Sequence, residues 1–203
     1  TLGLGAGALS AKASQLCRTT SGQPEGPFYP VNDQLDKDSD LTRVRGRSQR
    51  AKGEVVLFKG RVLNQDCLPI ENALVEIWQA CETGKYNHPG DPNPSKLDLN
   101  FQYWGRTRTN KKGEFLFKTI KPGSYPATSD WVRPPHFHVK VHLRGFEELT
   151  TQVYFKEEKE LNRKDRILQN LSAKDRDAVI VDFKKEQRKH YRAGHLNITL
   201  KSL

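Results

Sequence analysis

Between residues 136 and 143 the sequence alternates between apolar side chains and histidine or lysine. Because successive side chains of a β-strand point to opposite faces, this pattern predicts a strand with one face in a hydrophobic core. His136 and His138 share the other face, and two neighbouring imidazoles can supply half of a metal site. An H-x-H pair alone is more often a solvated face. The apolar positions are Phe137, Val139, Val141 and Leu143, and the polar ones are His136, His138, Lys140 and His142.

The rest of the chain predicts an all-β fold with one short helix near the C-terminus. Strand-like runs separated by turn residues lie at 54–63, 73–79, 105–109, 114–117, 136–143, 150–155 and 195–200. Many short strands separated by turns are typical of a β-sandwich. The glycine-containing turn at 110–113 predicts a hairpin between its flanking strands. The helix should begin at Ser172, which can cap it with Asp175 three residues later.

Two tyrosines accompany the histidine pair upstream. The segment 81–104, rich in Gly, Pro, Asn and Asp, is too long for a simple hairpin turn, and loops of that length usually carry function. It contains Tyr86 shortly after Gly84, and Tyr125 follows Pro-Gly-Ser at a second turn. This combination shifts the interpretation of His136 and His138 from a solvated face towards a metal site.

Composition favours one soluble domain. The 203 residues are enough to bury a core, and no run of 18 apolar residues predicts a membrane span. The formal net charge is +10, but 34 basic residues are interspersed with 24 acidic ones and form no basic stripe with aromatics. We therefore expect a solvated surface that favours small anions or a polyanionic matrix, rather than nucleic acid.

The first 24 residues are expected to form a signal-peptide remnant and a tail, ahead of one domain at 25–203. Residues 1–13 are small and apolar and end in an A-x-A pattern, which predicts export to the periplasm or the extracellular space. A glycine-rich tail is the alternative. The three cysteines, Cys17, Cys67 and Cys81, allow one internal disulfide and leave one thiol over, and no C-x-x-C pair suggests zinc.

Four motifs in this order resemble the intradiol ring-cleavage dioxygenases, chiefly the protocatechuate 3,4-dioxygenase branch and its single-domain relatives. The likeness covers roughly residues 25–200 and is carried by the combination, since each motif alone would be weak. The motifs are EGPFYP at 25–30, EIWQA at 76–80 leading to GKY at 84–86, TIKPGSYP at 119–126, and RPPHFH at 133–138.

The resemblance implies a non-haem Fe(III) site, a catechol-type substrate and O₂. In that family two tyrosinates, two histidines and a hydroxide hold the iron; Tyr86 and His136 would be equatorial ligands, and Tyr125 and His138 axial ones. The axial tyrosine leaves the iron when a catechol binds and takes up a proton. Oxygen is then inserted between the two hydroxylated carbons to give a muconate.

The residue types suit this chemistry. A free phenol has a pKa near 10, so its binding as phenolate at neutral pH requires a strong Lewis acid. Phenolate is a hard, anionic donor that matches Fe(III) better than Zn(II) or Fe(II). No carboxylate accompanies the histidine pair at useful spacing, which disfavours a zinc hydrolase.

Two further residues are implied to act on the substrate. Arg133 corresponds to the family arginine that leans over the ring, where its permanent charge can stabilise carbanion character. Gln152 corresponds to the glutamine that supports this arginine. The plainer alternatives are a surface arginine before a proline turn and a core amide. Trp78 is expected in the core, and the histidines that match no ligand position are His88, His142, His190 and His195.

The sequence also departs from the family pattern. Cys81 stands where relatives often carry asparagine, and Ala127 where protocatechuate enzymes tend to have an aromatic residue, so protocatechuate is in doubt as substrate. Because only about two dozen residues precede Gly26, we expect no N-terminal helical dimerisation region like that of catechol and hydroxyquinol dioxygenases, which argues against those enzymes by architecture but not against catechol as substrate. A homo-oligomer is left open.

The competing hypothesis is a non-catalytic binding module. The strands, turns and Pro-Gly-x-Tyr pattern also resemble the transthyretin-like or carboxypeptidase-regulatory-like β-sandwich. Such modules do not need the long loop at 81–104 or the RPPHFH motif, so the enzyme is the stronger hypothesis.

Overall fold

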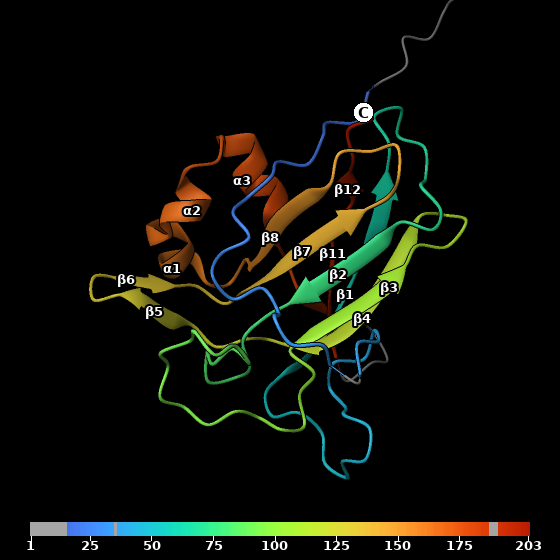
Figure 1. The fold of residues 1–203 in the computed structure, drawn as a ribbon. Coiled ribbons are helices and arrows are strands. Elements are labelled where there is room, and N and C mark those ends of the chain that lie inside the picture. Colours follow the sequence, from blue (N-terminus) through green and yellow to red (C-terminus); the bar gives the residue numbers. More distant parts are fainter. Residues whose placement is uncertain (1–15, 35, 187–190) are drawn as a thin grey trace, which may run out of the picture.

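Two β-sheets packed face to face form the body of the protein (Figure 1). The structure is a computed structural model that describes residues 16–34, 36–186 and 191–203. The predicted signal-peptide remnant at 1–13, and His190, lie outside these residues. The all-β sandwich predicted from the sequence is confirmed.

The first sheet is built around β1 (Val55–Leu63), its longest strand. On one side β4 (Glu114–Ile120) pairs with β1 in antiparallel register. On the other side two short strands of the chain end, β11 (Arg192–His195) and β12 (Ile198–Thr199), pair with β1 in parallel. The segment predicted as one strand at 195–200 is therefore interrupted. The edge strand β10 (Lys184–Lys185) pairs with β11.

The second sheet carries the histidine pair on its central strand. Its strands are ordered β3-β2-β7-β8-β9. They span β2 (Leu74–Trp78), β3 (Trp104–Arg108), β7 (His136–His142), β8 (Leu149–Phe155) and β9 (Ile180–Val181).

The core lies between the two sheets and contains the apolar face of β7, as the alternation predicts. Phe137, Val139 and Val141 are fully buried. Phe58 of β1 meets Phe137 across the sandwich, with ring centroids 4.9 Å apart. Since one face of β7 is committed to this core, the side chains of His136 and His138 must point the other way.

The hairpin predicted at 105–117 is wrong. β3 pairs with β2 in one sheet and β4 with β1 in the other, so the turn at 110–113 carries the chain between the sheets. Gly113 explains the difference: its carbonyl accepts a hydrogen bond from Val62 N at 2.8 Å, which ties the turn to the end of β1. Its φ of +70° and a Val62 oxygen 2.5 Å from any Cβ position both require glycine.

Three short helices replace the single one expected: α1 (Lys159–Lys164), α2 (Arg166–Gln169) and α3 (Ala173–Val179). The predicted start of α3 is confirmed, because the Ser172 side chain accepts a hydrogen bond from Asp175 N. α1 and α2 are too short to show a helical period, and Asp165 separates them in an extended conformation. No helix in the described part of the chain is long and apolar enough to cross a membrane.

A small hairpin projects beside these helices (Figure 1). It pairs β5 (Tyr125–Thr128) with β6 (Trp131–Arg133). Between β2 and β3, residues 79–103 contain neither helix nor strand, in keeping with the long loop predicted there.

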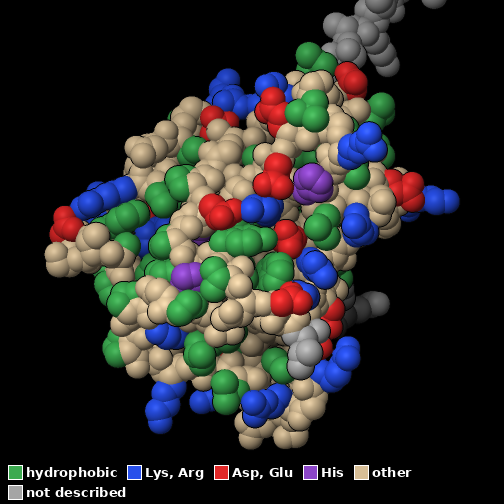
Figure 2. Space-filling model, in the orientation of Figure 1, with side chains coloured by type: hydrophobic (Ala, Val, Ile, Leu, Met, Phe, Trp, Pro, Cys, Tyr) green, Lys and Arg blue, Asp and Glu red, His purple; other side chains and the backbone are tan. Residues whose placement is uncertain are grey.

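Charged side chains of both signs are scattered over the face that carries the second sheet (Figure 2).

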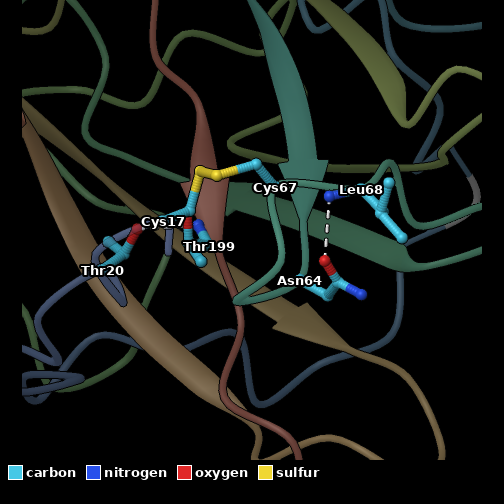
Figure 3. The surroundings of a disulfide bond; sticks show 6 residues. All are labelled: Cys17, Thr20, Asn64, Cys67, Leu68 and Thr199. Atoms are coloured by element: carbon cyan, nitrogen blue, oxygen red, sulfur yellow. Dashed lines mark hydrogen bonds between the residues drawn. A yellow bond between two sulfur atoms is a disulfide. The ribbon is translucent and has the colours of Figure 1, made fainter. Parts of the chain in front are cut away.

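A disulfide joins Cys17 to Cys67 and fixes the N-terminal segment to the turn after β1 (Figure 3). The segment then runs along the molecule, with Thr20 N donating to Thr199 O at 3.0 Å and Gln23 N to Thr150 O at 2.8 Å. Cys81 is free and buried, so one disulfide and one remaining thiol are confirmed.

Candidate metal centre

The fold brings His136, His138, Tyr86 and Tyr125 together from three separate elements. The histidines come from β7, Tyr125 begins β5, and Tyr86 belongs to the loop after β2. Ring centroids are 5.1 Å apart for the two histidines, 5.5 Å for the two tyrosines, 5.8 Å for Tyr125 and His136, and 6.4 Å for Tyr86 and His138. All four side chains are buried. The structure thus brings together the four side chains that the sequence analysis names as candidate ligands.

Aromatic neighbours hold the two imidazoles. Trp78 lies opposite His138 in the β2–β7 register, and its ring stacks on the imidazole with centroids 4.7 Å apart and planes 10° apart. Tyr154 of β8 flanks His136 in the same way at 5.8 Å. Trp78 is buried as expected, but it packs with the aromatic rings around the site rather than in the core between the sheets.

Two turns that contain glycine pack closely together and bring the two tyrosines near each other. The carbonyl oxygen of Cys81 accepts hydrogen bonds from both Gly84 N and Gly123 N, at 3.0 Å each. A Cβ on Gly84 would lie 2.4 Å from Ser124 O, and one on Gly123 would lie 2.2 Å from Glu82 O. Only glycine permits this approach, which places Tyr86 and Tyr125 two residues beyond each turn on the same side of the site.

Several polar atoms of these residues are buried without a partner in the described structure. They are Tyr86 Oη, His136 Nε2 and His138 Nδ1. His136 Nδ1 lies 2.7 Å from the carbonyl oxygen of Pro134, which can only accept, so Nδ1 carries the proton and Nε2 keeps its lone pair. Buried polar atoms without partners are costly, and a bound cation would satisfy them.

Burial keeps the four groups uncharged. It raises the pKa of Tyr86 well above the ordinary value, with Tyr125 adding to the shift, and raises the pKa of Tyr125 although Arg133 opposes this. Burial and then Arg133 lower the pKa of His138 to about 3, and lower that of His136 in the same way. The imidazoles are therefore in the neutral form that binds metals, and the phenols would have to lose protons on binding.

The donor set fits a hard, highly charged cation. Across residues 16–34, 36–186 and 191–203, no three His, Cys, Asp or Glu side chains are grouped to hold a metal ion. A metal at the histidine pair would therefore take its other protein donors from the tyrosines. Phenolate oxygens favour a strong Lewis acid of the ferric kind, so Tyr86, Tyr125, His136 and His138 fit the predicted ion.

Arg133 lies beside this cluster at the end of β6 and is held on two sides. Its Nε donates to Asp165 at 2.7 Å, and its Nη2 donates to Gln152 at 2.6 Å and to Tyr154 Oη at 3.3 Å. Asp165 is fully buried and also caps α2 by accepting from Leu168 N. The expected contact between Arg133 and Gln152 is present, and the alternative of a surface arginine is wrong, since Arg133 is buried.

A cavity of about 590 Å³ opens next to the cluster. Tyr125 and Arg133 line it, whereas the other three candidate ligands are not among its lining residues. The N-terminal segment closes one side: Phe28 packs on Tyr86 with ring centroids 4.8 Å apart. The cavity therefore gives a ligand access to Tyr125 and Arg133.

A family model described as Dioxygenase matches residues 24–202. The chain is 39% identical over 133 residues to the beta chain of protocatechuate 3,4-dioxygenase from Burkholderia cepacia, covering 64% of this chain and 56% of that protein. It is 30% identical over 149 residues to catechol 1,2-dioxygenase 2 of Acinetobacter lwoffii, covering 64% and 48%. The chain belongs to the intradiol ring-cleavage dioxygenase family. It spans about half the length of these curated relatives.

Solved structures of other proteins have the same fold as this intradiol dioxygenase family member. The dioxygenase domain of a carbohydrate-binding fusion protein from Streptomyces sp. SirexAA-E is 26% identical, with a TM-score of 0.68 and coverage of 92% of this chain and all of that domain. An intradiol ring-cleavage dioxygenase from Tetranychus urticae is 22% identical, with a TM-score of 0.70 and coverage of 92% and 96%.

The two departures from the family pattern lie close to the site. Cys81 is buried with its Sγ 3.3 Å from Thr83 Oγ1, and its backbone joins the two tyrosine turns. Ala127 lines the cavity, so the alanine that replaces the aromatic residue of the protocatechuate enzymes lies in the cavity wall.

Of the histidines excluded from the ligand set, the three within the described residues touch none of the four candidate ligands. His142 is exposed at the end of β7 and faces Glu148, and His195 lies on β11 of the other sheet. His88 packs on Phe28, with ring centroids 5.6 Å apart.

Sequence reasoning missed several residues around the site. Asp165 and Tyr154 support Arg133, Asp91 holds the backbone of Tyr86 by accepting its N–H at 2.6 Å, and Gln23 donates to Gln152 O at 3.0 Å. Except for the contact of Asp91 with Tyr86, which lies within one loop, these contacts join different elements of the chain, so no spacing could have revealed them. Gly84 and Gly123 were the available signal, because glycines beside both tyrosines indicate close backbone approach.

Proposed function

We propose that this protein is a non-haem Fe(III) dioxygenase that cleaves a catechol-type ring between its two hydroxylated carbons, using O₂, to give a muconate. One observation carries the proposal: two tyrosines and two histidines, three of which have an unpartnered buried polar atom, converge beside a cavity that Arg133 lines. Family membership supplies the reaction class. A transthyretin-like or carboxypeptidase-regulatory-like binding module would give no reason for these buried, unpartnered atoms, which reduce stability.

Tyr86, Tyr125, His136 and His138 would hold the ion. When bound, ferric iron would supply the Lewis acidity that stabilises phenolates and activates the bound catechol towards O₂. The protein would fix the direction of each donor in advance, because β7 is paired on both sides and the tyrosine turns are joined at Cys81.

Tyr125 is the candidate ligand that meets the substrate. Of the four residues it alone lines the cavity, and it is 9% exposed where Tyr86 and His136 are 3% and 1% exposed. Burial raises the pKa of its phenol, so a released Tyr125 phenolate would be a strong base in this setting. Its Oη is therefore placed to take a proton from an incoming catechol hydroxyl.

Arg133 would stabilise negative charge that builds up on the ring. Its guanidinium reaches the cavity while Asp165, Gln152 and Tyr154 fix its orientation. A donor placed in advance in a site shielded from water stabilises developing charge without having to reorganise. Gln152 would act through Arg133 rather than on the substrate.

The visible spectrum of the iron-loaded protein tests the proposal. Two phenolates on Fe(III) should give a charge-transfer band that colours the protein burgundy or brown. Tyr125→Phe should weaken and shift this band at unchanged iron content. A colourless protein that contains one iron per chain would overturn the ligand set. Oxygen uptake on catechol with a muconate as product tests the reaction itself.

We also propose that the protein is exported, and that copies of the chain associate. The Cys17–Cys67 disulfide supports export, since such bonds persist in oxidising compartments. The similarity to both an alpha and a beta chain of protocatechuate 3,4-dioxygenases supports association. Fractionation of the producing cells and light scattering of the purified protein test the two proposals separately.

A further inference from the structure

We propose that the cavity beside Tyr125 and Arg133 takes uncharged catechols with an apolar ring substituent, and selects against catechols that carry a carboxylate. This inference rests on the proposed function, and it names the substrate class of the same site. It follows from the size of the cavity, the character of its wall and the state of the charges around it.

The cavity has room beyond one ring. Its volume is about 590 Å³. Pockets of roughly 300–1,000 Å³ bury ligands of drug size, so a bare catechol would leave much of the space unfilled. A substituent on the ring would fill it.

Apolar side chains from five segments form much of the wall that such a substituent would meet. Phe28 belongs to the N-terminal segment, Pro94 to the long loop, Ala127 to β5, Trp131 to β6 and Ile167 to α2. Burying an apolar group against these side chains is favourable in proportion to the area removed from water. Ala127 leaves space where a larger side chain would narrow the cavity.

Two of the lining residues in the described chain are charged, Asp91 and Arg133, and both are already engaged. Asp91 accepts from Tyr86 N at 2.6 Å and from Asn93 N at 2.8 Å, with Lys85 Nζ 4.0 Å away. The charge of Arg133 is opposed by the buried Asp165 at 2.7 Å. The one cationic side chain of the wall, Arg133, is therefore already paired with an anion, and no unpaired cation is left for a carboxylate.

Arg166 is the cation at the rim. It does not line the cavity, its Nη2 donates to Asp130 at 2.6 Å, and its guanidinium lies 5.3 Å from the centre of the Trp131 ring. A ring carboxylate would thus enter near Asp91 and lose water without gaining an unpaired cation, which is unfavourable. An uncharged substituent has no such cost.

The test compares 3,4-dihydroxybenzoate with its methyl ester, two ligands that differ chiefly in charge. Dissociation constants are measured by titration calorimetry on the iron-loaded protein under nitrogen, so that binding is separated from turnover. The ester should bind about tenfold more tightly or better, because the carboxylate must be desolvated without compensation. 4-Ethylcatechol should likewise bind more tightly than the acid.

A cation added to the wall should reverse the preference. Ala127→Arg should strengthen binding of the acid by about tenfold relative to the ester, since it places a guanidinium in the cavity without an anionic partner. Ala127→Gln is the matched control for bulk and should leave the ratio as in the wild type. Arg166→Gln should also leave the ratio unchanged.

The outcomes separate this inference from the proposed function. Equal or tighter binding of the acid by the wild type overturns the inference, even if catechols are cleaved. A loss of acid binding in Arg166→Gln overturns it too, because the rim arginine would then act as a carboxylate site. Tighter binding of the ester without oxygen uptake on any catechol would retain the substrate class and overturn the proposed reaction.

Discussion

His136 and His138 differ from the other described histidines in being buried against aromatic rings with a ring nitrogen left unpartnered. The sequence could predict this pair, because alternation along a strand is a local pattern that decides which side chains share a face. It could predict their tyrosine partners only through the order of the motifs. No local pattern tells which loop will meet β7.

Replacing either histidine by alanine should abolish stoichiometric iron binding while the sandwich still folds. The core-facing side of β7 is formed by Phe137 and Val139, which these changes do not touch. Iron per chain, measured by elemental analysis beside a far-UV circular dichroism spectrum, checks the prediction. His142→Ala is the control on the same strand and should keep its iron, since His142 is exposed. Equal loss of iron in the control would show that the ligands are wrongly assigned.

Arg133→Ala should separate turnover from metal binding. The iron and its visible band should be retained, while kcat falls by roughly 10²–10³, the usual effect of removing one donor to developing charge. Arg133→Lys should rescue only in part, because an ammonium lacks the planar fork of the guanidinium. The variant should also lose stability, since Asp165 would be left as an unpaired buried charge, an effect of about 3–5 kcal/mol.

The double variant Arg133→Ala, Asp165→Asn resolves the two effects. Asparagine can still accept from Leu168 N at the start of α2, and it removes the unpaired charge. Stability in urea should therefore recover, whereas oxygen uptake should remain low. Recovery of both together would mean that Arg133 serves only the fold.

Among the secondary-structure elements, the longer strands were predictable, whereas the short strands β5, β6, β9 and β10 and the partners of all strands were not. β7 and β1 have clear patterns, but the turn at 110–113 looks like a hairpin turn and instead joins two sheets. Turn chemistry is local, whereas strand pairing depends on which sheet edge is free. α1 and α2 escaped prediction for a related reason: they are too short for periodicity and are placed by tertiary contacts such as that of Asp165 with Arg133.

Gly123→Ala should damage the metal centre through the backbone. The new Cβ would lie 2.2 Å from Glu82 O, so the turns that carry Tyr86 and Tyr125 would have to separate. We expect a loss of roughly 1–3 kcal/mol of stability, as for other overpacked sites, together with weaker iron binding and a weaker visible band. Gly22→Ala is the control, because its Cβ would meet Thr150 O at an ordinary 3.7 Å. Wild-type iron affinity in Gly123→Ala would show that the close approach of the turns is not required.

Considered as a whole, the molecule is a sandwich with its N-terminal segment laid across the second sheet to the candidate metal centre. Beyond Thr20 and Gln23, this segment meets Gln152, whose Nε2 donates to Pro24 O at 2.8 Å, and then reaches the site. There a Cβ on Gly26 would lie 3.5 Å from the ring of His138, and Phe28 packs on Tyr86. The EGPFYP motif marked this segment in the sequence, but its course over the sheet could not be predicted, because contacts such as that of Gln152 with Pro24 join residues more than a hundred positions apart.

The disulfide that anchors this segment should contribute a large share of the stability of the whole molecule. It joins residues 50 positions apart, and closing a loop of that length in the unfolded chain corresponds to about 4 kcal/mol in the chain-entropy model. Cys17→Ser, or reduction of the metal-free wild type, should lower the free energy of unfolding in urea by about 2–4 kcal/mol. Cys81→Ala is the control: it leaves the disulfide intact, so reductant should lower its free energy of unfolding by the same amount as in the wild type. The iron-loaded Cys17→Ser variant should keep its visible band, because β7 and the tyrosine turns are held without the disulfide. An unfolding midpoint that does not change on reduction would mean that the Cys17–Cys67 bond does not stabilise the fold, and would remove the support that it gives to export.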